Sequence, residues 1–257
     1  MFWNKMNKTE ERQIEELAEI KGLLQRHFVE LKKRADLNPN SLLDASIFLL
    51  EESIDLYGSL TSLYKDNYLR SCVIIARSIL EASISLQYIY KNDADKRASN
   101  FILFSRKTAL DRLKKANDSG QIKEEHILWF EDAVRDYSPS GKGKGGWDRK
   151  SIRNIFEELE LVGVYDEWYS RLSNYTHVNY VGNRDLSLES PYRDRLKKFI
   201  FRDVFLITLE ALRLMNEKLD LLEGGVVIHG YPKENMMYFF SINKKATEAE
   251  LRKENML

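Results

Sequence analysis

The sequence predicts an all-α protein, a bundle of antiparallel helices around one central apolar helix. Residues 68–90, YLRSCVIIARSILEASISLQYIY, form the longest apolar run of the chain and contain neither Gly nor Pro. Apolar residues occur on nearly all sides of this predicted helix, which is typical of a helix in the middle of a bundle. The flanking segments repeat apolar residues at steps of three and four, which indicates amphipathic helices that pack around it.

The composition is that of a soluble globular protein. Of the 257 residues, 31% are charged and 43% are hydrophobic, and this length suffices for one sizeable core or two small ones. The 40 Lys and Arg residues balance 40 Asp and Glu residues. The total charge therefore gives no argument for nucleic-acid binding, although a local basic patch could still bind RNA.

The expected location is the cytoplasm. The single cysteine, Cys72, lies in the apolar run and is expected to be a small buried side chain, so no internal disulfide can form. The N-terminal MFWNKMNKTEER has no apolar segment like that of a signal peptide. Charges break the apolar runs before they reach the roughly 20 residues that span a bilayer.

Two helices are expected before the central one. Apolar residues recur at helical spacing over residues 8–35, and Asn38-Pro39-Asn40 should end this amphipathic helix. Ser41 is the expected N-cap of the second helix. The short Asp66-Asn67 turn should make the second helix and the central one antiparallel neighbours.

The chain after the central helix is expected to be mostly helical. Helices are predicted over residues 94–116, 124–137, 151–163 and 192–222, and a helical stretch between the last two has the buried stripe Trp168, Leu172, Tyr175 and Val178. Gly163 and Gly224-Gly225 should end two of these helices, and residues 226–232 and 236–242 could pair as a small C-terminal β-hairpin. The predicted organisation is an N-terminal amphipathic helix (1–40), a helical bundle (41–223) and a C-terminal hairpin or tail (224–257).

Residues 138–151, SPSGKGKGGWDRKS, form the clearest loop. Its basic residues are Lys142, Lys144, Arg149 and Lys150. The order of residues does not match a P-loop, and no predicted strand precedes it. Two interpretations remain, a contact with RNA phosphates and a solvated flexible connector.

Arg77 and Glu81 are the two charges of the central run. They are four residues apart and so lie on one helix face, with the base before the acid, which is the less favourable order on an exposed helix. We therefore expect a buried ion pair that reaches toward another helix and is architectural rather than a reaction centre.

The segment RLSNYTH, residues 171–177, contains the residue types best suited to catalysis. Arg171, Asn174 and His177 follow at steps of three, so each is displaced by about 60° from the one before it. Histidine is the natural acid and base near neutral pH, and arginine binds phosphate while it stays charged. Such a trio suits phosphodiester cleavage without metal. The spacing alone also allows the alternative in which His177 hydrogen-bonds inside the core while Arg171 is solvated.

No cofactor is expected. A di-iron bundle would need Glu-x-x-His on two helices, and the four histidines are scattered over different predicted elements. No zinc-protease motif or cysteine cluster occurs in the sequence.

A chain predicted to be all-helical with an Arg-x5-His motif at 171–177 resembles the HEPN superfamily over roughly residues 41–222. More narrowly, the ARSILE run at 76–81, followed much later by SNYTH at 173–177, resembles an uncharacterised bacterial branch of similar helical proteins. The resemblance implies RNA cleavage by attack of the 2′-hydroxyl on its own phosphate, with His177 as acid and base and Arg171 stabilising the phosphorane. It further implies a homodimer, a toxin–antitoxin or phage-defence role, and a regulatory protein partner. Leu172 departs from the polar residue that usually follows the arginine, so either Asn174 takes that role or the site is inactive.

A second interpretation is a non-catalytic helical module that binds a partner protein or a small ligand. Arg77, Glu81 and His177 would then form a buried polar network whose loss destabilises the fold. The two interpretations differ in the exposure that they predict for these side chains.

Overall fold

The computed structural model describes residues 8–117, 124–135, 150–170, 172, 175 and 192–221. Within these ranges the ordered elements are all helices, and no strand occurs. The prediction of an all-α helical bundle is therefore confirmed. The predicted C-terminal hairpin lies outside the described residues.

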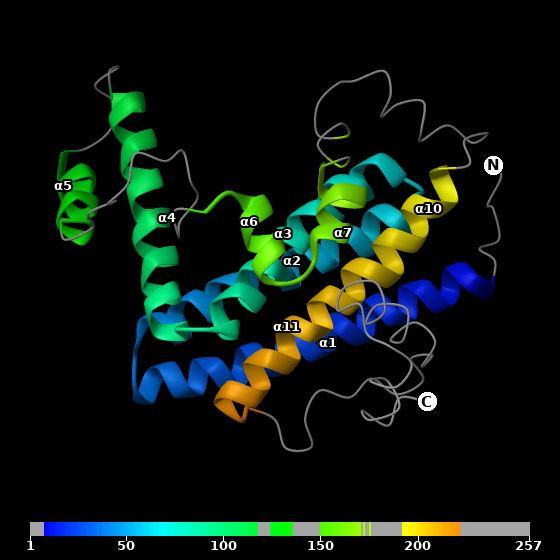
Figure 1. Ribbon diagram of the computed structural model, residues 1–257, viewed down its shortest axis with the longest axis horizontal. Helices are drawn as coiled ribbons and strands as arrows, with labels where there is room; N and C mark the ends of the chain where they lie inside the picture. The colour runs from blue at the N-terminus through cyan, green and yellow to red at the C-terminus, as the bar shows by residue number, and fades with distance from the viewer. Residues whose placement is uncertain are drawn as a thin grey trace.

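Three long helices that follow one another in the sequence belong to the bundle (Figure 1). They are α1 (Lys8–Leu37), α2 (Ser41–Lys65) and α3 (Leu69–Lys91). The N-cap of α2 is Asn40 rather than the predicted Ser41, because the Asn40 side-chain oxygen accepts a hydrogen bond of 3.0 Å from the Leu43 N–H. The predicted turn between α2 and α3 is confirmed, with Asn67 in the left-handed region at φ 60°.

Helix α3 is the central helix, as predicted. It packs against α2 on one side and against α11 (Val204–Leu219) on another, and Cys72 is fully buried within it. By length and composition α3 could cross a bilayer, but 67% of its most apolar window is buried in the protein, as for the core helix of a bundle. Leu17, Ile20 and Leu24 of α1 belong to the same core, so the N-terminal helix is part of the bundle.

Buried hydroxyl groups join α2, α3 and α11 at the centre of this core. Thr208 Oγ1 lies 2.9 Å from Tyr57 Oη and 2.9 Å from Ser83 Oγ, and it donates to the Val204 carbonyl. A hydroxyl has one proton and two lone pairs. Since the Thr208 proton goes to Val204, Tyr57 and Ser83 both donate to Thr208, whose hydrogen-bonding capacity is then filled.

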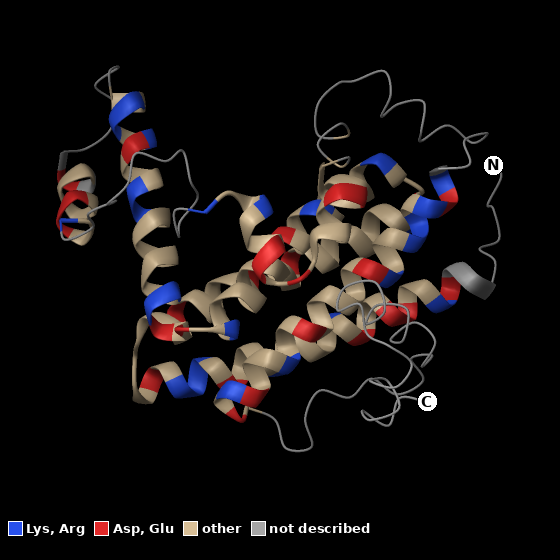
Figure 2. Cartoon of the chain, viewed as in Figure 1, with Lys and Arg blue, Asp and Glu red and all other residues tan. Residues whose placement is uncertain are grey.

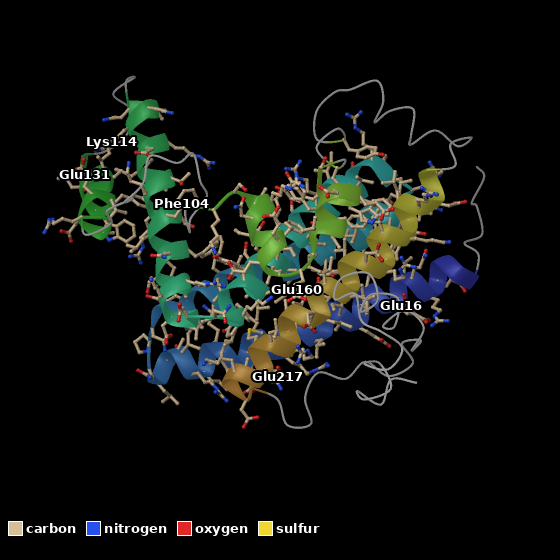
Figure 3. All side chains as sticks on the ribbon, in the orientation of Figure 1. Glu16, Phe104, Lys114, Glu131, Glu160 and Glu217 are labelled. Atoms are coloured by element: carbon tan, nitrogen blue, oxygen red, sulfur yellow. The ribbon has the colours of Figure 1, made fainter. Side chains whose placement is uncertain are left out.

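Helices α4 (Ala94–Ala116) and α5 (Glu124–Ala133) project from the bundle as an arm (Figure 1). The bounds of α4 agree with the prediction. An ion pair between Lys114 and Glu131 joins the two helices of the arm (Figure 3). Trp129 is 59% exposed on α5.

In the described part of the chain three short elements follow α5, and the first of them ends before the predicted stop at Gly163. Ser151 caps α6 (Ile152–Glu158) as predicted. The chain leaves α6 through Glu160, a non-glycine residue at φ 63°, whereas Gly163 lies inside the next helical turn, α7 (Val162–Val164). A π-helical turn, η2 (Tyr165–Tyr169), continues from α7.

The last long helix is continuous but contains a second π-helical turn. Its parts are α10 (Tyr192–Lys198), η3 (Phe199–Asp203) and α11. It ends at Asp220, with φ 48°, whose N–H donates to the Asn216 carbonyl at 2.7 Å. The predicted stop at Gly224-Gly225 is therefore wrong, because an aspartate already supplies the left-handed residue.

Candidate functional site

One stripe of α3 is only partly covered by the other helices. Arg70, Ile74, Arg77 and Glu81 are all partly exposed, and their spacing of four, three and four residues places them on one helix face. The sequence predicted a helix that is apolar and buried nearly all round. The stripe therefore belongs to the part of the central helix that solvent reaches.

Arg77, Glu81 and Tyr169 form a hydrogen-bonded cluster on this stripe. Arg77 Nε donates to Glu81 Oε1 at 3.0 Å, and the Tyr169 hydroxyl donates to the same oxygen at 2.9 Å. Arg77 Nη2 also donates to the Tyr169 hydroxyl at 3.3 Å, and the guanidinium carbon lies 4.9 Å from the centre of the tyrosine ring. The arginine is thus held by a carboxylate, a hydroxyl and a π face.

The cluster corrects the prediction of a buried pair between helices. The Arg77 side chain is 21% exposed and that of Glu81 is 44% exposed, and the ion pair joins two residues of the same helix. The link to another element, η2, is made by Tyr169 and not by the charges themselves. The pair is therefore accessible to solvent.

The environment keeps Tyr169 protonated and Arg77 charged. Burial and the nearby charge of Glu81 raise the pKa of Tyr169 to about 12, so its hydroxyl stays a donor. Burial alone would lower the pKa of Arg77, but hydrogen bonds to Tyr169 and Glu81 outweigh burial and raise it. At neutral pH Arg77 is therefore a cation and the Tyr169 hydroxyl is neutral.

Aromatic stacking positions η2 against the rest of the bundle. The rings of Tyr165 and Tyr169 stack with 5.4 Å between centres, and Phe156 of α6 packs against both. Trp168 stacks on Phe199 of η3 at 4.5 Å. The two π-helical turns thus pack against each other, and such turns are frequent at functional sites.

The predicted catalytic residues Arg171, Asn174 and His177 lie outside the described residues. Within the same segment, Leu172 and Tyr175 are 0% and 1% exposed. With Trp168 they confirm three members of the predicted buried stripe, and the fourth, Val178, is not described. The segment follows Tyr169 in the sequence after one residue.

Of the basic loop, Lys142, Lys144 and Arg149 lie outside the described residues, and Lys150 is described. Lys150 forms an ion pair with Glu158, and its ammonium lies 5.3 Å from the centre of the Tyr88 ring. For the loop that contains this residue, the sequence left open a contact with RNA phosphates and a solvated connector. In the structure it anchors the end of the loop to α6 and α3.

Glu158 and Arg97 complete that anchor. Arg97 pairs with the other Glu158 carboxylate oxygen, donates to the Tyr88 carbonyl at 2.6 Å, and lies 3.8 Å from the Tyr88 ring centre. Burial would raise the pKa of Glu158, but hydrogen bonds from Lys150 and Arg97 outweigh burial and lower it. The cluster fixes α6, and with it η2, to α3 and α4.

Sequence reasoning missed Tyr169, Arg97 and Glu158 as members of polar clusters. Tyr165 and Tyr169 are four residues apart, which indicates a shared helix face. That spacing was the available signal for Tyr169. Nothing local connects Arg97 with Glu158, because they are 61 positions apart.

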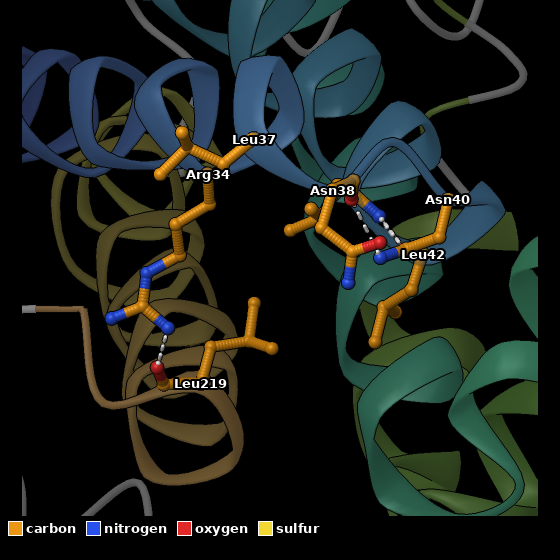
Figure 4. Close-up of a pocket in the computed structure, with 7 residues that line it drawn as sticks. Arg34, Leu37, Asn38, Asn40, Leu42 and Leu219 are labelled. Carbon is orange, nitrogen blue, oxygen red and sulfur yellow. Dashed lines mark hydrogen bonds between the residues drawn. The ribbon is translucent and has the colours of Figure 1, made fainter.

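A depression of about 420 Å³ lies where α1 and α11 end and α2 begins (Figure 4). The Arg34 guanidinium donates to the carbonyls of Leu219 and Asp220, the latter at 2.6 Å. These are among the last carbonyls of α11, which have no partner inside the helix. The arginine of this pocket therefore caps a helix.

In the described part of the chain, no three His, Cys, Asp or Glu side chains are grouped as for a metal ion.

The fold and site define an all-α bundle whose central helix exposes one polar stripe. The chain belongs to a family of unknown function, DUF5677, which matches residues 43–192, more than half of the chain. The matched region contains α3, η2 and the 171–177 segment, and it ends where α10 begins. Comparison with curated proteins and with solved structures gives no match.

Proposed function

We propose that this protein is a metal-independent endoribonuclease of the HEPN type. His177 removes the proton from an RNA 2′-hydroxyl, whose oxygen then forms a bond to the adjacent phosphorus. Arg171 stabilises the charge of the phosphorane, and Asn174 supplies the polar contact that Leu172 cannot. The bond from phosphorus to the 5′-oxygen breaks and that oxygen takes a proton from protonated His177, which leaves a cyclic phosphate and a free 5′-hydroxyl.

The observation that carries the proposal is the partial exposure of the Arg77–Glu81–Tyr169 cluster. The cluster ends one residue before the segment that contains Arg171 and His177, and Glu81 is 44% exposed. A polar cluster that served only the core would be expected to be buried, because exposed ion pairs contribute little to stability. Polar groups held in place beside an open surface suit a reaction site.

The alternative is a non-catalytic module in which Arg77, Glu81 and His177 have a structural role. Its supporting observation is that Arg77, Glu81 and Tyr169 bind one another and so attach η2 to α3. This alternative predicts a buried network, and the partial exposure of Glu81 argues against it.

The proposed biological setting follows the superfamily resemblance. We infer a cytoplasmic toxin or phage-defence effector that acts as a homodimer, with RNA as substrate and a regulatory protein as partner. Lys142, Lys144 and Arg149 are the loop residues proposed to contact RNA phosphates, a role that lysine and arginine serve through charge.

The test is cleavage of labelled total RNA in the presence of EDTA. Wild type should cut RNA but not DNA of the same sequence, and the products should accept a 5′-phosphate from a kinase without prior treatment. His177→Ala and Arg171→Ala should abolish cutting while circular dichroism shows intact helices, and His229→Ala serves as a histidine control. Cutting that persists in both folded variants would refute the assigned roles. A well-folded wild type that leaves RNA intact would favour the binding module.

A further inference from the structure

The sequence of α10 is strongly basic for a chain whose charges balance overall. Arg193, Arg195, Lys197 and Lys198 lie within six consecutive residues, with Asp194 as the acidic residue among them. Arg195 and Lys198 are exposed, and Arg193 and Lys197 are partly exposed. Four of the five charged residues of α10 are therefore cationic, and we call their surface the cationic face although exposed Asp194 lies within it.

The corner between α2 and α3 continues this face. Arg193 Nη2 donates to Asn67 Oδ1 at 3.3 Å, and the Lys197 ammonium lies 5.9 Å from the Tyr64 ring centre. The corner adds two cationic residues, Lys65 and Arg70, against one acidic residue, Asp66. Lys and Arg gather on α10 and the adjoining α2–α3 corner in Figure 2.

An exposed aromatic ring lies within this corner. Tyr68 is 60% exposed, and as the N-cap of α3 it makes no side-chain capping hydrogen bond. A large aromatic side chain left in solvent beside several cations matches the sites where proteins bind single-stranded nucleic acid. Such sites neutralise the phosphates with Lys and Arg and stack the bases on aromatic rings.

The face leads to the candidate site along α3. Arg70 and Arg77 belong to the same exposed stripe, and seven residues of helix separate them by about 10 Å. On the other side, η3 continues directly from α10, and its Phe199 stacks on Trp168 of η2. The basic face and the Arg77 cluster are therefore on connected elements.

We propose that α10 and the α2–α3 corner form a binding surface for single-stranded RNA, which we call the α10 surface. It is defined by Lys65, Tyr68, Arg70, Arg193, Arg195, Lys197 and Lys198. The choice of RNA over other polyanions rests on the proposed function. The surface holds phosphates on its cations and one base on Tyr68, and it directs the strand along α3 toward Arg77.

The experiment measures binding by fluorescence anisotropy with a labelled 2′-O-methyl oligouridylate of about 12 nucleotides. This oligonucleotide lacks the attacking hydroxyl, so binding is observed whether or not the protein cuts RNA. The double variant Arg195→Glu/Lys198→Glu should bind about 25-fold more weakly at about 0.1 M salt, because each lost phosphate contact removes about 0.7 from the salt slope. Tyr68→Ala should weaken binding by about 5-fold or more without changing that slope, and Tyr68→Phe should restore it.

The matched control is Arg112→Glu/Lys115→Glu. These exposed residues have the same types and spacing but lie near the end of α4, on the opposite side of the molecule from α10 (Figure 1). This variant should bind as wild type does. Equal weakening by both double variants would overturn the proposal, as would wild-type binding no tighter than to a duplex of the same length. If ordinary RNA is not cut but the α10 variants lose binding, the ribonuclease proposal fails and the surface stands. If RNA is cut and the α10 variants still bind, the proposed surface fails and the ribonuclease proposal stands.

Discussion

Thr208→Val tests the buried hydroxyl cluster that joins α2, α3 and α11. Valine has nearly the shape of threonine but cannot accept a hydrogen bond. In the variant, the hydroxyls of Tyr57 and Ser83 lose the acceptor that each has at 2.9 Å. Tyr57 and Ser83 are 1% exposed, so water does not replace that acceptor.

The magnitude follows from the alternatives open to each hydroxyl. An unsatisfied buried donor costs about 1–3 kcal/mol. Ser83 can rotate and donate to a carbonyl of the preceding turn of its own helix, which serine commonly does, whereas the rigid Tyr57 ring cannot follow. We expect Thr208→Val to lower the free energy of unfolding by about 2–4 kcal/mol, the larger part from Tyr57.

The assay is urea unfolding followed by circular dichroism, arranged as a double-mutant cycle. Tyr57→Phe alone should cost about 1 kcal/mol, because Thr208 keeps its other two partners. In the Thr208→Val background the same change should cost nothing or stabilise, since it removes the orphaned hydroxyl. Equal costs in the two backgrounds would refute the reasoning that Tyr57 depends on Thr208.

Three further predictions concern single residues. Tyr169→Phe keeps the stacked ring but removes the hydroxyl that joins Glu81 to Arg77. RNA cleavage should therefore fall about tenfold or more, while the free energy of unfolding changes by about 1 kcal/mol. Unchanged cleavage would show that Tyr169 is not part of the site. Glu158→Gln leaves Arg97 without its charge partner and should cost about 3 kcal/mol in urea unfolding, whereas a cost below about 1 kcal/mol would show the pair to be dispensable. Burial lowers the pKa of His27 in the folded protein below its ordinary value of 6.5. The folded state therefore favours the neutral imidazole, and the stability that is present above about pH 6.5 is lost as the pH falls through the lowered pKa of the folded state.

The pH prediction has a direct control. The His27 Nδ1 hydrogen-bonds to the Leu23 carbonyl at 2.9 Å, which leaves Nε2 buried without a partner among the described residues. When the pH is lowered from about 7.5 to about 5.5, the free energy of unfolding measured in urea should therefore fall more for wild type than for His27→Leu. A constant difference between the two proteins over this range would contradict the assignment.

Most helices could be predicted from the sequence because their signal is local. The stretches over α1 to α4 repeat apolar residues with the helical period, and the predicted bounds of α4 agree with the structure. Helix ends were less predictable. Asn40, rather than its neighbour Ser41, caps α2, since both are good caps and only the backbone path decides between them.

The ends at Glu160 and Asp220 show the same limit. Glycine is the usual residue at a left-handed position, so Gly163 and Gly224 were the natural expectation. Both predicted stops come after the real ones. A non-glycine residue accepts this conformation when tertiary packing turns the chain at that point.

What the sequence by itself determined is the all-α class, the central position of α3 and the stripes that face the core. These follow from apolar periodicity, which any helix must satisfy to bury one face. Only the tertiary structure decided which polar groups meet. Tyr169 reaches Glu81 across 88 positions and Glu158 reaches Arg97 across 61, and the partial exposure of the Arg77–Glu81 pair depends on where neighbouring helices end. The physical reason is that the geometry between elements determines which groups form hydrogen bonds. The spacing of residues within one element contains no information about that geometry.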